Sequence, residues 1–215
     1  MKAFDTHTFD VKTYEWELLE FKKMLDSKQE LSENRDILPF FRQCRELSCQ
    51  IATLHPEVIN TEKIAYEFDV FGDFKSDLVI GDTTSNTYCF IEFEDAKKDS
   101  LFVDKRSKYK PEFSPRLEHG LSQIIDWFYK IEGLQNTDDM AERFGQNKIN
   151  YEGILVVGRN HYLTPATKKR LDWRTKYVLI NSRNILCYTF DDLFDVLNYK
   201  FQFIKNLANY IPPQY

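Results

Sequence analysis

The fold is decided by one short stretch, TYCFIEFE, at residues 87–94. Its aromatic and β-branched residues predict a β-strand, and its apolar content indicates that the strand is largely buried. Successive side chains of a strand point to opposite faces of a sheet, so Glu92 and Glu94 share one face with Phe90. The pattern therefore predicts two carboxylates side by side at the end of a buried strand.

A third carboxylate is expected near this pair. Asp77 lies at the start of the preceding predicted strand, and residues 81–86 have the composition of a hairpin turn. A hairpin would bring Asp77 and Glu92 to the same end of the sheet. Carboxylates are costly to bury together without positive charge between them, and their hard oxygen atoms suit Mg²⁺ or Mn²⁺. The alternative is that Asp77 is a turn residue and that the two glutamates line a solvated edge.

The remaining chain alternates helical and strand patterns. Helices are predicted at residues 14–25, 33–54 (with a break at Pro39), 115–134, 138–144, 165–176 and 191–207, and further strands at 64–71, 76–80, 151–157 and 184–190. This order predicts an α/β fold, with a mixed β-sheet flanked by helices. Residues 1–60 are expected to form a helical N-terminal region for regulation or oligomerisation, and residues 61–215 the main domain. Residues 95–113 show no regular spacing of apolar residues and are predicted to form a loop, and loops of that length tend to be functional or mobile.

One predicted helix carries a polar and aromatic stripe. His119, Gln123 and Trp127 are four residues apart and share a helix face. Gln123 could orient a water molecule, and His119 could contact a phosphate or titrate near neutral pH. The alternative is a half-buried histidine above a surface glutamine, with no chemical role.

Basic residues gather in two segments, although the formal net charge of the chain is −5. The segments contain Lys97, Lys98, Lys105, Arg106, Lys108 and Lys110, and then Arg159, Lys168, Lys169, Arg170, Arg174 and Lys176. Such segments are usually solvated faces, but beside an acidic cluster they are also typical of a groove that follows a phosphate backbone. The average charge therefore argues against a protein coated in positive charge but not against a local basic groove.

Composition excludes several other classes. The chain has only 7 glycines among 215 residues, and neither GxGxxG nor GK[ST] occurs, so no nucleotide cofactor is expected. The 4 cysteines form no CxxC pair, which favours free thiols and a cytoplasmic location. We expect neither a signal peptide nor a membrane span, because the apolar runs are too short.

Taken in order, these motifs resemble those of the Shedu anti-phage defence nucleases, within the PD-(D/E)xK nuclease superfamily. The matching strings are FIEFEDA at 90–96, LF at 101–102, SPRLEHG at 114–120, QIIDW at 123–127, GILVVGR at 153–159 and YTFDDL at 188–193. The resemblance covers roughly residues 62–200. It implies a restriction-endonuclease-like sheet and a metal-dependent DNA endonuclease of prokaryotic cytoplasm that assembles into homo-oligomers.

The resemblance also implies roles for individual residues. Asp77 and Glu92 would be metal ligands, whereas Glu94 stands where the general motif has a catalytic lysine. Either Lys97 or Lys98 would then supply the missing cation, or Glu94 would bind a second metal ion. Gln123 and His119 complete the expected catalytic set. The residues expected to contact nucleic acid are Lys98, Lys105, Arg106, Lys108, Arg159, Lys168, Lys169 and Arg170.

Two competing functions remain open at the level of sequence. Glu94 in the lysine position, together with the acidic net charge, is compatible with a degenerate nuclease fold that only binds nucleic acid or a protein partner. An acidic-pair hydrolase acting on sugars would also use two carboxylates. That last class gives no role to the two basic segments.

Overall fold

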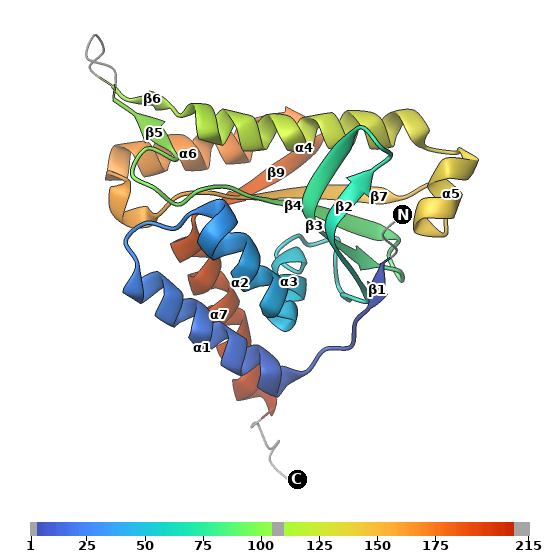
Figure 1. Cartoon of the computed structure of the whole chain (residues 1–215), viewed down its shortest axis with the longest axis horizontal. Coiled ribbons are helices and arrows are strands. Elements are labelled where there is room, and N and C mark those ends of the chain that lie inside the picture. Colours follow the sequence, from blue (N-terminus) through green and yellow to red (C-terminus); the bar gives the residue numbers. More distant parts are fainter. Residues whose placement is uncertain (1–3, 105–109, 209–215) are drawn as a thin grey trace, which may run out of the picture.

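The computed structural model describes residues 4–104 and 110–208 as a mixed sheet with helices on both faces (Figure 1). The strands are β1 (Asp5–Thr6), β2 (Lys63–Val70), β3 (Phe74–Asp82), β4 (Thr87–Phe93), β5 (Phe102–Val103), β6 (Glu112–Phe113), β7 (Asn150–Val156), β8 (Leu179–Ile180) and β9 (Arg183–Tyr188). The helices are α1 (Val11–Ser27), α2 (Leu38–Gln43), α3 (Arg45–Ala52), α4 (Pro115–Leu134), α5 (Asp138–Phe144), α6 (Pro165–Tyr177) and α7 (Phe190–Ala208), with a π-helical turn η1 (Glu33–Ile37) and a 3₁₀ turn η2 (Asn160–Tyr162).

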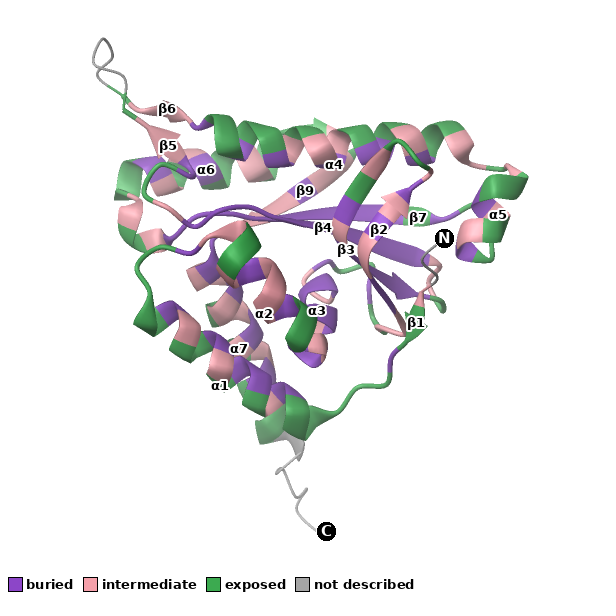
Figure 2. Cartoon of the chain, in the orientation of Figure 1, coloured by how far each residue is buried: buried purple, intermediate pink, exposed green. Residues whose placement is uncertain are grey.

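The central sheet has the strand order β1-β2-β3-β4-β7-β9-β8. Strands β2, β3 and β4 form an antiparallel meander, and β7 and β9 then add in parallel to β4. Parallel neighbours need crossover connections, which here run through α4 and α5 and then through α6. Strand β4 lies in the middle, and all seven of its residues are buried (Figure 2).

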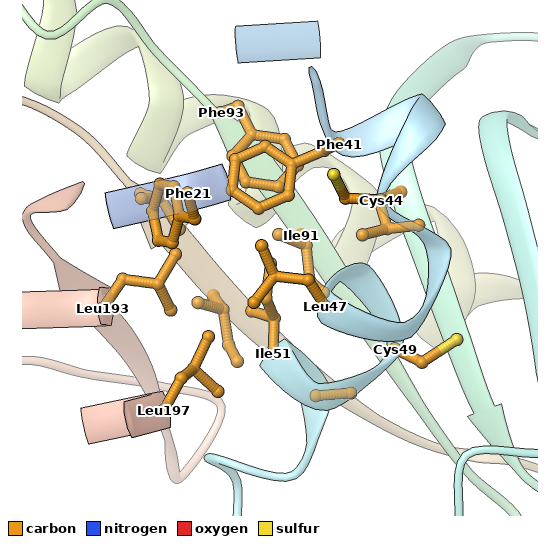
Figure 3. Close-up of a cluster of buried hydrophobic side chains, with 14 of the residues drawn as sticks. Phe21, Phe41, Cys44, Leu47, Cys49, Ile51, Ile91, Phe93, Leu193 and Leu197 are labelled. Carbon is orange, nitrogen blue, oxygen red and sulfur yellow. The ribbon is translucent and has the colours of Figure 1, made fainter. Parts of the chain in front are cut away.

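Each face of the sheet has its own apolar core. On one face α1, α2, α3 and α7 cover the strands, and on the other face lie α4, α5 and α6 (Figure 1). In the first core, Phe41 of α2 stacks on Phe93 of β4 with ring centroids 4.4 Å apart (Figure 3). The helices of residues 1–60 thus pack directly on the central strand, in the same core as Leu193 and Leu197 of α7.

The predicted fold class is confirmed, and most element boundaries agree within a few residues. The predicted helix over residues 33–54 is the main departure, because the chain there forms η1, α2 and α3 in succession. Pro39 falls in the first turn of α2, and Cys44 has a non-helical backbone between α2 and α3. The segment 95–113 contains the short β5–β6 hairpin, and two-residue strands of this kind leave no periodic pattern to detect.

Among the described residues, no helix is both long and apolar enough to cross a membrane.

Candidate functional site

Asp77 and Glu92 are brought together by the β3–β4 hairpin. The ladder pairs Leu78 with Ile91, and the Oδ2 atom of Asp77 accepts a hydrogen bond from the Phe93 backbone N–H at 2.9 Å. A side-chain hydrogen bond between the Asp77 and Glu92 carboxyl groups raises the pKa of Glu92 and opposes the rise at Asp77, as expected of a carboxyl pair that holds one shared proton. Burial is the first cause that raises the pKa of both groups, and the charge on Asp77 raises the pKa of Glu92 further.

Glu94 lies beneath α4 and is almost completely buried, with 1% of its surface exposed. Helix α4 can pass this close because residue 120 is glycine. A Cβ atom on Gly120 would lie 3.1 Å from Glu94 Cγ and 2.6 Å from Leu155 Cδ1. Burial raises the pKa of Glu94 to about 7, although the neighbouring Arg116 opposes that shift.

Arg116 joins the carboxylate cluster to the N-terminal region. Its guanidinium contacts Glu94 at 3.0 Å, Asp95 at 3.5 Å and Glu33 of η1 at 3.6 Å. Asp95 in turn accepts a hydrogen bond from the Glu33 backbone N–H at 2.8 Å and pairs with Lys97 at 2.6 Å. Burial raises the pKa of Glu33, and the Asp95 charge adds to that shift.

Sequence reasoning missed Glu33, Asp95 and Arg116 as members of this site. Asp95 directly follows Glu94 and could have been included with it. Arg116 is the second residue of α4, whose start at Ser114-Pro115 the sequence predicts correctly, but no spacing rule connects it to a strand. Glu33 enters through tertiary packing of η1, for which the sequence offers no signal.

Several oxygen atoms of the site are buried without a hydrogen-bond partner. These atoms are Glu92 Oε2, Glu94 Oε1 and Gln123 Oε1. Gln123 lies on the same face of α4 as Gly120 and Arg116, which places it on the side that covers Glu94. Buried acceptors without a donor are costly, and carboxylate and amide oxygens are the ligands that Mg²⁺ prefers. The donor set therefore fits a hard divalent cation.

In the present conformation part of the carboxylate charge is balanced without a metal ion. Asp77 and Glu92 share a proton, and Arg116 neutralises Glu94. Within residues 4–104 and 110–208, no group of three or more His, Cys, Asp or Glu side chains is arranged to hold a metal ion. Metal binding would thus require loss of the shared proton and rearrangement of these side chains.

The remaining predicted catalytic residues lie at different depths. Lys97 is half-buried beside Asp95, and His119 is exposed but close enough to act electrostatically on Glu33. Trp127 departs from the predicted polar stripe, because it is 1% exposed and packs near Phe90 in the core. Its large apolar surface is better buried than solvated.

The predicted phosphate-binding residues separate into three groups. Lys105, Arg106 and Lys108 lie outside the described residues. Lys98 and Lys169 are exposed. Lys168 pairs with Asp192 at 2.8 Å, and Arg170 donates to the Pro111 carbonyl at 2.6 Å and lies over the rings of Phe102 and Phe113.

Arg159 is buried and is held by contacts within the protein. Only 6% of its surface is exposed. Its guanidinium bonds to Asp191 at 3.0 Å and to the backbone carbonyls of Leu25 and Lys28 at 3.0 and 2.7 Å. These contacts tie α1 to α7, so Arg159 stabilises the fold, and its contact with nucleic acid stays a prediction.

A groove of about 400 Å³ lies next to Lys97 and Lys98, and Arg159 is also part of its lining. Lys97 and Lys98 line one end of it, and the β5–β6 hairpin and η2 line its sides. Asp99 and Asp104 also face the groove, so its lining carries both signs of charge. Lys97 connects the groove to the carboxylate cluster, because its Nζ also pairs with Asp95.

The comparisons with known proteins identify the family. No curated protein matches the chain. A family model described as "Shedu protein SduA, C-terminal" matches residues 30–194, from just before η1 to the start of α7. Since this match covers most of the 215 residues, the chain belongs to the Shedu family.

Proposed function

We propose that this protein is a metal-dependent DNA endonuclease that hydrolyses phosphodiester bonds. Membership of the Shedu family implies a role in anti-phage defence. The observation that carries the proposal is the set of buried, unpartnered oxygen atoms of Glu92, Glu94 and Gln123 beside the proton-sharing Asp77. Buried oxygen atoms without partners destabilise the folded protein, but they are suited to binding a hard cation.

Under this proposal Asp77, Glu92 and Glu94 would hold Mg²⁺ or Mn²⁺. When bound, the ion lowers the pKa of a water molecule and neutralises charge on the scissile phosphate. The side-chain oxygen of Gln123 is free to accept a hydrogen bond from the attacking water and so to orient it. Lys97 supplies positive charge for the phosphate, and exposed His119 can donate to a phosphate oxygen at the edge of the site.

A second function is favoured by one specific observation. Glu94 takes the place of the lysine in the general nuclease motif, and Arg116 already neutralises it at 3.0 Å. A site whose negative charge is already balanced by an arginine could bind nucleic acid or a protein partner without cleaving it. Metal binding separates the two functions, because a pure binding module has no need for a divalent cation.

The experiment is incubation of the purified full chain with plasmid DNA, linear duplex DNA and RNA. Each substrate is tested with Mg²⁺, with Mn²⁺ and with EDTA, and in parallel with Asp77→Asn and Glu92→Gln variants. Glu118→Gln is the matched control, because Glu118 lies on α4 but pairs with Arg174 outside the cluster. We expect metal-dependent DNA cleavage that both site variants abolish and the control retains. Cleavage in EDTA, or full activity of Glu92→Gln, would overturn the proposal.

A further inference from the structure

Arg116 stands at the boundary between the buried carboxylates and solvent. Its side chain is 43% exposed, whereas that of its main partner Glu94 is 1% exposed. The NH1 and NH2 groups contact carboxylates, but Nε makes no hydrogen bond to the described residues. A guanidinium presents five N–H donors in a planar fork. Part of this fork is therefore available to an anion that approaches from solvent.

A second cation lies beside this guanidinium. The Oδ2 atom of Asp95 bonds to Lys97 Nζ at 2.6 Å and also contacts Arg116 NH2 at 3.5 Å. One carboxylate oxygen thus holds the two cations next to each other. The Lys97 side chain is 40% exposed, and Lys97 also lines the neighbouring groove.

We propose that Arg116 and Lys97, positioned by Asp95, form a binding site for a phosphodiester group of nucleic acid. The proposal rests on the function proposed above insofar as it places the phosphate beside the carboxylates. Arg116 provides from α4 the positive charge that the strand lacks at Glu94. Its contacts with Asp95 and Glu33 are longer than its contact with Glu94. A phosphate can therefore replace the longest contact, with Glu33, while Glu94 and Asp95 continue to hold the guanidinium.

Phosphate is favoured over a protein carboxylate as the ligand because of the neighbouring charge. Glu33, Glu94 and Asp95 surround the guanidinium, and an added anion must overcome their repulsion. A phosphodiester in a nucleic acid brings many neighbouring charges and releases counterions when it binds, which supplies that free energy. Arginine also binds phosphate oxygens with two parallel hydrogen bonds.

The experiment measures binding of a labelled linear DNA duplex in EDTA, so that cleavage does not interfere. Fluorescence anisotropy gives the dissociation constant at several salt concentrations for the wild type and for Arg116→Ala and Arg116→Lys. Arg45→Ala is the matched control, because Arg45 is similarly exposed (38%) and pairs with Asp5 away from the site. Loss of one phosphate contact reduces the slope of log K against log salt by about 0.9.

We expect Arg116→Ala to weaken binding by roughly tenfold and to lower the salt slope by about one contact. Arg116→Lys should keep the slope, and Arg45→Ala should match the wild type. If Arg116→Ala does not fold because Glu94 loses its partner, Glu94→Gln is compared with Glu94→Gln/Arg116→Ala. Residue 94 is neutral in both of these variants, so removing Arg116 does not leave a buried negative charge without a partner.

An unchanged slope and affinity in Arg116→Ala overturns the inference, as does an equal loss in Arg45→Ala or a wild type that does not bind DNA. The outcome is distinct from that of the cleavage experiment. A wild type that binds through Arg116 but never cleaves contradicts the nuclease proposal and leaves the phosphate site standing. A wild type that cleaves DNA but binds it with no contribution from Arg116 contradicts the phosphate site and supports the nuclease proposal.

Discussion

Replacing Glu92 with glutamine should stabilise the metal-free protein while removing its activity. Burial, followed by the charges of Asp77 and Glu94, raises the pKa of Glu92 well above neutral pH. The folded protein without metal therefore keeps Glu92 protonated at pH 7, whereas the unfolded chain ionises it near pH 4.5. Folding must take up that proton, and the free energy of unfolding is lower because of it.

The magnitude follows from the difference between these two states. A group whose pKa is raised by folding binds more protons in the native state, so its cost is absent below about pH 4.5 and grows by about 1.4 kcal/mol per pH unit above it. At pH 7 the cost is about 3 kcal/mol, a sizeable part of the roughly 5–15 kcal/mol that stabilises a domain. The glutamine side chain of the Glu92→Gln variant is neutral at every pH, and its amide N–H can donate to Asp77 in place of the shared proton.

The assay is urea unfolding of wild type and Glu92→Gln in EDTA, at several values between about pH 5 and pH 8. The two proteins should be similar near pH 5, and the variant should become progressively more stable as the pH rises. Added Mg²⁺ should stabilise the wild type and have little effect on the variant. Parallel stability curves, or a variant that is less stable at pH 8 in EDTA, would refute the reasoning that burial of Glu92 lowers the free energy of unfolding.

Further predictions concern the helix above the site, the N-terminal region and the metal. Gly120→Ala should destabilise the protein by about 1–2 kcal/mol and reduce cleavage, because its Cβ would press on Glu94 and Leu155. Gly133→Ala in the same helix meets nothing within 4 Å and should instead stabilise by up to about 1 kcal/mol, as measured by urea unfolding. Glu17→Gln should stabilise the protein increasingly from about pH 5 to pH 7, because burial raises the pKa of Glu17 to about 7, and the gain should level off above that pH. A constant difference between about pH 5 and pH 7 would contradict this reasoning. Isothermal titration with Mg²⁺ should show proton release, and no heat at all would argue for the binding-only function.

The sequence predicts the sheet well because β4 is specified by local pattern alone. A run of mostly aromatic and β-branched residues with a turn before it leaves few alternatives, and the carboxylates at its end follow from strand alternation. The pairing of Asp77 with Glu92 is predicted correctly because both belong to one hairpin, whose register is set by a short turn. Predictions of this kind succeed when the interacting residues are close along the chain.

The parts that sequence reasoning missed depend on distant contacts. Arg159 is basic and follows a strand, so its pattern predicts a phosphate ligand, but the sequence does not indicate its contacts with Leu25, Lys28 and Asp191. Arg116 is the opposite case, because nothing in its surroundings along the chain marks it as a site residue. The surroundings of both arginines depend on how far each side chain is buried. That burial is set by helices that are distant in sequence and pack against these residues.

These contacts also show how the N-terminal region can influence the site. The Glu33 carboxylate contacts Arg116, and its backbone N–H donates to Asp95. Leu31 pairs with Ala96 through a β-bridge, and the Lys98 N–H donates to the Glu30 carboxylate. The chain immediately before η1 is therefore bonded to the segment that carries Asp95 and Lys97.

Any movement of η1 alters the partners of Arg116, and with them the charge that balances Glu94. If the site holds a cation as proposed, we expect a change in the N-terminal helices to alter its affinity for that cation.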